Sequence, residues 1–176
     1  SGFGTGTFGN GAFSDPSAAD FFPLTWSLAN YGQSLICNPR GQGIFWWQNN
    51  TATPAALLTN APAKSVLVTV TPNLQIMALG CTNTSGTFDP LCIRVSDAEL
   101  PTSWTITSSN LADQVFLDSG SRIVGCAWLS NSIYVWTNSS VWQGVFTGNY
   151  QQPWVFEKVA DDCGLIGPNA VTTLNQ

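Results

Sequence analysis

Two carboxylates stand at a spacing that could support acid–base chemistry. Asp97 and Glu99 are two positions apart. Residues i and i+2 of a strand share a face and lie roughly 6 to 7 Å apart at the backbone, a distance compatible with the paired carboxylates of a glycosidase. Such pairs are also common on solvated turns, and we favour that interpretation. We therefore predict no catalysis at this pair.

Cysteines are the second group of candidates, at positions 37, 81, 92, 126 and 163. The chain has no histidine, so neither a Ser-His-Asp nor a Cys-His catalytic system can form, nor a Cys/His zinc set. Neither a P-loop nor a dinucleotide fingerprint is present. We predict that the protein is not an enzyme, with no catalytic, cofactor-binding or metal-binding residues. The cysteines are expected to be small core residues, with a local bridge between Cys81 and Cys92 left open.

Eight tryptophans, at positions 26, 46, 47, 104, 128, 136, 142 and 154, have two interpretations. Large rings could fill the space between packed sheets, which we favour for most of them. They could instead form a carbohydrate-stacking surface, as in a lectin. Trp46 and Trp47 are adjacent, so on a strand they face opposite ways, and one can be buried while the other faces a partner or a neighbouring sheet.

Charge is scarce along the 176 residues. Charged side chains make up 9%, against about 25% in an ordinary globular domain. This suits a protein that buries its surface against partners, although a secreted β-protein with an uncharged polar surface remains an alternative. The net charge of −5 and five scattered Lys and Arg residues argue against nucleic-acid binding. No apolar run reaches the roughly 18 residues of a membrane helix, so we expect no membrane insertion.

Turn signals and short apolar runs predict an all-β fold with under about 10% helix. Single helical turns are possible at residues 15–22 and 96–103. Residues 1–23 are rich in glycine and aromatic side chains and predict an extended arm, because dense glycine cannot hold a helix. A flexible terminus is the alternative for the arm. The folded domain is expected over residues 24–176.

Three segments, 35–48, 75–97 and 122–137, each combine an apolar strand, a polar turn and a second strand that begins with isoleucine. We predict that Ile44, Ile93 and Ile133 begin the second strand of three successive sheets. The first strands are anchored at Ile36, Ile76 and Ile123, and "CGLIGPNAV", around Ile166, is expected to start a further repeat. A period of 40 to 50 residues is typical of a β-propeller-like array of small antiparallel sheets, here an incomplete one. The alternative is a two-sheet β-sandwich.

Two longer stretches follow distinctive patterns. "TWSLANYGQSLICNPRGQGIFWW" is similar to W-x-L-D-N-x-G-E-D-L-I-A-x-P-R-G-G-x-I-x-x-W, and "DPLCIRVSDAELPTSW" to D-P-x-x-V-R-W-S-D-Q-E. In both stretches the chain resembles a family of virion proteins of tailed bacteriophages. Later strands and the glycine-rich arm follow in the same order. Ala29 and Ser34 replace two aspartates of the family, Val95 a tryptophan and Ala98 a glutamine. These changes put a charge role in doubt but leave the strand pattern intact.

This resemblance implies a structural component of the virion, most closely a hub or nozzle protein of the tail. Its partners would be other tail proteins and copies of itself, and it would be made in the host bacterial cytoplasm. Family members continue well beyond residue 167, so the chain is expected to be a fragment or a shortened relative. A glycan-binding all-β module is the alternative function. A sialidase-like propeller would need Arg40, Arg94 and Arg122 together, but "FLDSGSRI" does not complete an Asp-box.

Overall fold

The computed structural model describes residues 25–173, so the predicted arm and the helical turn at 15–22 lie outside the described residues. The described part contains twelve β-strands and no helix, which confirms the all-β prediction for it. It follows that no helix of residues 25–173 could cross a membrane.

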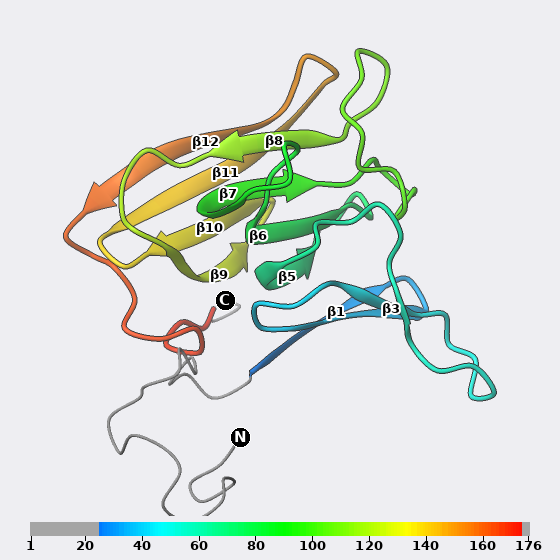
Figure 1. Cartoon of the computed structure of the whole chain (residues 1–176). Helices are drawn as coiled ribbons and strands as arrows, with labels where there is room; N and C mark the ends of the chain where they lie inside the picture. Colours follow the sequence, from blue (N-terminus) through cyan, green and yellow to red (C-terminus); the bar gives the residue numbers. More distant parts are fainter. Residues whose placement is uncertain (1–24, 174–176) are drawn as a thin grey trace, which may run out of the picture.

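The strands form three antiparallel sheets of four strands each (Figure 1). Sheet 1 contains β1 (Trp26–Tyr31), β2 (Ser34–Pro39), β3 (Phe45–Trp47) and β4 (Ala56–Leu57). Sheet 2 contains β5 (Ser65–Val70), β6 (Ile76–Thr82), β7 (Phe88–Val95) and β8 (Asp113–Phe116). Sheet 3 contains β9 (Ile123–Leu129), β10 (Ser132–Thr137), β11 (Ser140–Asn149) and β12 (Gln152–Asp161). Within each sheet the spatial order of the strands follows the chain.

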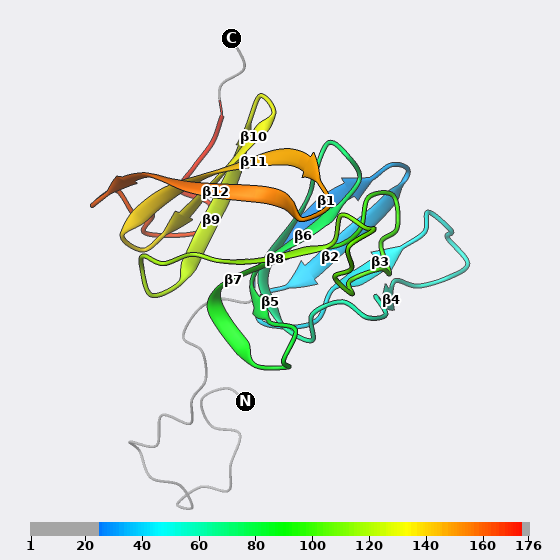
Figure 2. The same ribbon diagram turned by 90° about the horizontal axis from the view of Figure 1, so that it is seen from above.

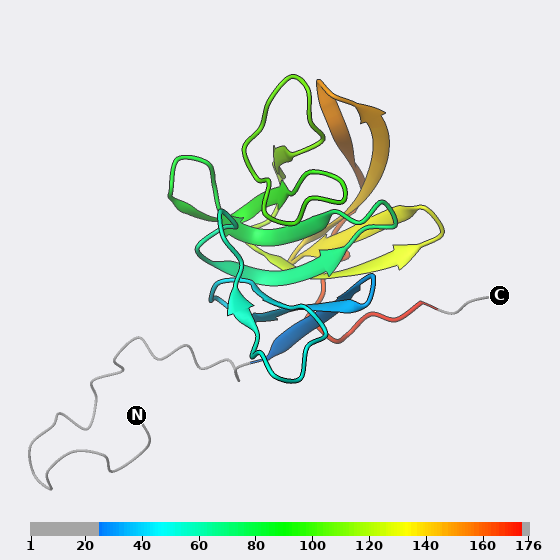
Figure 3. The same ribbon diagram turned by 90° about the vertical axis from the view of Figure 1, so that its right-hand side faces the viewer.

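Sheet 2 lies between the other two sheets, as Figures 2 and 3 show. Alternation along β6 explains how it does so, because successive side chains of a strand point to opposite faces. Met77 and Leu79 belong to the core shared with sheet 3, whereas Ile76 and Ala78 belong to the core shared with sheet 1. Every residue of β6 is buried. The apolar run in this strand is therefore the signature of a sheet covered on both faces.

The first strands of the three sheets lie close together. β5 contacts β1 and β2 on one side and β9 on the other, and the outer strands β8 and β12 also touch. One side-chain bond joins sheets 1 and 2 here, since the amide of Val68 donates to the hydroxyl of Ser27 at 2.9 Å. A cavity of about 310 Å³ is lined by residues of β1, β5 and β9 together with Pro168 and Asn169.

The three repeat isoleucines are fully buried. Ile93 lies in sheet 2 and Ile133 in sheet 3, as predicted, whereas Ile44 lies directly before a strand of sheet 1 and packs in the core between sheets 1 and 2. The predicted second-strand position is confirmed for Ile133 but wrong for Ile44 and Ile93. Ile44 directly precedes β3 and Ile93 lies in β7, both third strands, whereas Ile133 lies in the second strand, β10. Every hairpin of a meander has the same apolar–turn–apolar pattern, so the pattern cannot tell one hairpin of a sheet from the next.

Two further local predictions are wrong. Residues 96–103 form turns around an isolated bridge between Asp97 and Leu100, not a helical turn. Ile166 does not begin a strand and is 97% exposed. Residues 163–165, just before it, are bonded to the turn between β10 and β11 instead. The amides of Cys163 and Leu165 donate to the carbonyls of Ser139 and Thr137. With its amides directed at a turn, the segment cannot pair as a strand there.

Candidate functional site

The structure gives the Asp97 carboxylate a role in holding the backbone. Its Oδ1 atom accepts hydrogen bonds from the amides of Ala98 and Leu111, both at 2.9 Å. Glu99 follows in a turn with φ of 58°, a left-handed conformation that is uncommon for a residue with a side chain. The two carboxylates are therefore not neighbours on one strand face, as the glycosidase reading required.

The three arginines are distributed over different parts of the fold. Arg94 is buried on β7, where its guanidinium donates to the carbonyls of Thr82 and Trp104 and lies 5.7 Å from the centre of the Trp104 ring. Burial lowers the pKa of Arg94. Arg40 lines the cavity between the first strands, and Arg122 is exposed before β9. A buried guanidinium bound to two carbonyls has no face left for a shared substrate site.

The cysteines form no disulfide in the described residues. Cys81 and Cys92 are fully buried between sheets 1 and 2. A hydrogen bond with the Cys92 thiol, together with burial, raises the pKa of Cys81, and burial raises the pKa of Cys126 to about 12. A thiol with a raised pKa stays protonated at neutral pH and does not attack. The described residues also contain no group of three or more His, Cys, Asp or Glu that could bind a metal.

Most of the tryptophans pack between sheets. Trp104, Trp142 and Trp154 are buried, and Trp128 packs edge-on against Trp154 at 6.2 Å. Each indole N–H of these four rings has an acceptor within the protein, for example Gln75 for Trp154 at 3.2 Å. Buried rings with satisfied N–H groups serve packing rather than ligand binding.

Sheet 1 leaves an apolar surface uncovered. Cross-strand partners share a face, and the register joins Leu28 to Cys37, Cys37 to Phe45 and Phe45 to Leu57. The alternate row, Ala29 and Ile36 with Trp46, faces sheet 2. We call the other side the outer face of sheet 1; its larger side chains are Trp26, Leu28, Leu35, Phe45, Trp47 and Leu57.

The outer face of sheet 1 is unusually exposed for its chemistry. Trp26 is 56% exposed, and Leu28 and Leu57 are each 62% exposed. The matching face of sheet 3 is partly covered by the chain itself, because a Cβ atom at Gly125 would meet Leu165 at 3.0 Å and the Pro168 carbonyl at 3.1 Å. Apolar side chains gathered on one exposed face are typical of surfaces that bind proteins, membranes or ligands.

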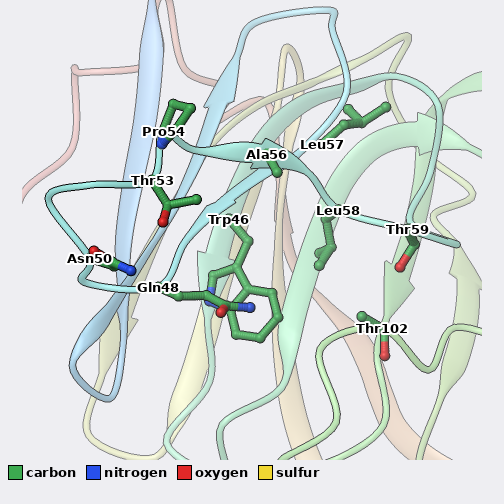
Figure 4. A pocket seen from close by; sticks show the side chains of 10 residues that line it. All are labelled: Trp46, Gln48, Asn50, Thr53, Pro54, Ala56, Leu57, Leu58, Thr59 and Thr102. Carbon is green, nitrogen blue, oxygen red and sulfur yellow. The ribbon is translucent and has the colours of Figure 1, made fainter.

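The opposite side of sheet 1 carries a pocket at the β3–β4 edge, shown in Figure 4. Trp46 and Leu58 form its wall beside the core, and Gln48, Asn50, Thr53, Thr59 and Thr102 contribute polar groups. The cavity has a volume of about 430 Å³ and no charged residue in its lining. Thr102 comes from the loop that follows sheet 2's third strand, so the pocket could not be foreseen from the sequence near Trp46.

The adjacent residues Trp46 and Trp47 point to opposite sides of sheet 1. Trp46 faces sheet 2 and the pocket, whereas Trp47 lies on the outer face. The prediction that they point in opposite directions is confirmed. Compared with known proteins, the chain matches no family model and no curated protein.

Proposed function

We propose that this chain is a structural component of a bacteriophage tail, formed as a sector of a β-propeller and assembling with other tail proteins and with copies of itself. Three consecutive four-stranded meanders support the propeller part of this proposal. Their first strands gather around one cavity, and sheet 2 packs face to face on both neighbours. Successive blades of a propeller are packed in a similar way, which supports this part of the proposal.

The observation that carries the assembly part is the outer face of sheet 1. Sheet 2 has the same strand order and a neighbouring sheet packed on each face, with Phe88 and Phe116 exposed at the ends of β7 and β8. Sheet 1 has a neighbour on one face and presents Trp26, Leu28 and Leu57 to solvent on the other. Between residues 25 and 63 the sequence contains a single charged side chain, Arg40. A face that is apolar and nearly free of charge is suited to burial against another protein.

The resemblance to tailed-phage virion proteins supports the location, and the matching residues have structural roles here. In the matched residues 89–104, the Ser96 hydroxyl accepts a hydrogen bond from the amide of Ile76 at 2.9 Å, and the Asp97 carboxylate accepts one from the amide of Leu111. In the matched residues 25–47, Gly32 and Gly41 have φ values of 59° and 76°, which favour glycine. The matched residues build turns and buried polar contacts, as expected of a structural protein.

The assembly part is tested by light scattering after gel filtration at micromolar concentrations. The unmodified chain should exceed its monomer mass, and a Leu28→Lys, Leu57→Lys variant should return it to the monomer. Leu100→Lys with Leu129→Lys is the matched control, since these leucines are 54% and 50% exposed but lie off the outer face. A monomeric unmodified chain, or equal behaviour of both variants, would count against the proposal.

The location is tested separately by mass spectrometry of purified phage particles and by labelling them with an antibody raised against residues 25–173. We expect the protein in intact particles and the label on the tail. Absence from purified particles would refute the virion role and leave the assembly result standing.

A further inference from the structure

The pocket beside Trp46 has a lining that suits one class of ligand. Its polar groups are amides and hydroxyls, it contains no carboxylate or ammonium group, and its apolar wall includes an indole ring. Its volume of about 430 Å³ falls in the range of small-molecule sites. A charged ligand has no ion-pair partner in this lining, whereas a neutral ligand with several hydroxyl groups finds both hydrogen-bond donors and acceptors.

The rim of the pocket is held in place before any ligand binds. The indole N–H of Trp47, on the outer face, donates to the carbonyls of Asn50 and Thr53 at 3.0 and 3.2 Å. Asn50 also accepts the amide of Ala52 through its side chain at 3.0 Å. These bonds fix the loop from the far side of the sheet. A loop fixed in this way costs less ordering entropy when a ligand binds.

The Trp46 ring is likewise held in one orientation. It is partly exposed and packs edge-on against Tyr31, with ring centres 6.5 Å apart. In Figure 4 the side chain of Gln48 lies beside this ring, and that of Thr53 lies farther away, on the loop near Pro54. Neither forms a hydrogen bond to the part of the chain that the structure describes, so their polar groups are available to a ligand.

Two buried polar atoms next to the pocket are unsatisfied. The Trp46 indole nitrogen and the Tyr31 hydroxyl have no hydrogen-bond partner among the described residues. A buried donor without a partner costs free energy. A ligand hydroxyl that reached the Trp46 nitrogen would satisfy this donor.

We propose that this pocket binds a neutral sugar unit of a polysaccharide, with the Trp46 ring packing against the C–H face of the sugar and Gln48 and Thr53 bonding its hydroxyls. The pocket lies mainly on the side of sheet 1 opposite the outer face, and Leu57 at the β4 edge belongs to both. Gln48 and Thr53 line the pocket and are not among the outer-face side chains, so variants at these two residues test sugar binding separately from assembly. Sugar binding here would give a structural protein a point of contact with a surface glycan.

The test is isothermal titration of the whole chain with three neutral trisaccharides, maltotriose, cellotriose and fully N-acetylated chitotriose, and with trigalacturonic acid as a charged comparison. We expect at least one neutral trisaccharide to bind with a dissociation constant on the order of 1 mM, and the acid not to bind. A Gln48→Ala, Thr53→Ala variant should weaken binding about tenfold, the effect of two lost hydrogen bonds.

The matched control is Gln33→Ala with Thr84→Ala, which removes the same two side-chain types from exposed turns away from the pocket. It should bind as the unmodified chain does. A Trp46→Phe variant, checked for folding by its denaturation midpoint, should also bind more weakly. The proposal is overturned if no neutral trisaccharide binds at about 10 mM, tenfold above the expected constant, or if the pocket variant and the control bind equally.

Discussion

Sheets 1 and 2 have the same strand order but different surroundings. Sheet 2 is enclosed, and each residue of β6 is buried. In β1 of sheet 1 exposed and half-buried residues alternate, because only the face toward sheet 2 is covered. Sheet 1 nevertheless carries Leu28, Phe45 and Leu57 on its uncovered face, as a sheet with two neighbours would. Its composition is thus that of an enclosed sheet with one neighbour missing, which is why we propose assembly.

The largest effect is expected from truncating the three buried isoleucines. Ile44→Ala, Ile93→Ala and Ile133→Ala should each lower the free energy of unfolding by about 2–5 kcal/mol, because each leaves a cavity between packed sheets. All three side chains are fully buried, so sheet 1's inner face should be as sensitive as sheet 2. Urea denaturation measures this. A loss below about 1 kcal/mol for Ile44→Ala would mean that sheet 1 packs loosely on sheet 2.

A smaller loss is expected from adding a methyl group between sheets 2 and 3. A Cβ atom at Gly144 would lie 2.5 Å from the ring of Phe156 and 2.7 Å from Ile133. Gly144→Ala should therefore cost about 1–3 kcal/mol by overpacking.

Gly43→Ala is the comparison on sheet 1. Its Cβ would lie 2.7 Å from Leu57, whose exposed side chain can move aside. The change should stay within about 0.5 kcal/mol. Equal losses for the two glycine variants, by urea denaturation, would show that Leu57 is fixed in place.

A modest pH effect is expected where sheets 2 and 3 meet at β8 and β12. Burial raises the pKa of Asp113, although its carboxylate accepts the amides of Gln114 and Trp154. An acid whose folded pKa is raised stabilises the fold below its unfolded pKa, near 3.8, and loses that contribution as pH rises through the folded value. Relative to Asp113→Asn, the unmodified protein should gain stability from about pH 7 to about pH 4. Denaturation midpoints at both pH values measure this, and an unchanged difference between the two proteins would argue against a buried acid.

The smallest effect is expected on the outer face of sheet 1. Leu28→Ala should change the stability of the monomer by no more than about 0.5 kcal/mol, because this side chain is 62% exposed. Thermal denaturation at high dilution, where association is suppressed, measures this. A loss as large as that of Ile44→Ala would show that Leu28 is covered even in the monomer.

The local sequence pattern predicted the strand content well. It failed to predict which strands of a sheet each hairpin would form. Residues 132–137 alternate between half-buried and buried positions, the period expected of a strand with one covered face. The same apolar–turn–apolar pattern predicted equivalent strand positions for Ile44, Ile93 and Ile133. Ile133 lies in a second strand, whereas Ile44 and Ile93 belong with third strands. Ile166 shows the same limit, since an apolar residue after a turn becomes a strand only where a neighbouring edge is free to pair.

The sequence by itself determined the all-β character, the absence of histidine chemistry and the opposite directions of Trp46 and Trp47, because composition and a two-residue period are local properties. The tertiary structure alone decided which faces are covered and which residues form the pocket. Thr102 joins Trp46 there from a distant loop, and sheet 1 has a neighbouring sheet on one face where sheet 2 has one on each. Burial depends on what packs against a strand, and long-range packing is not recorded in the pattern of the strand itself.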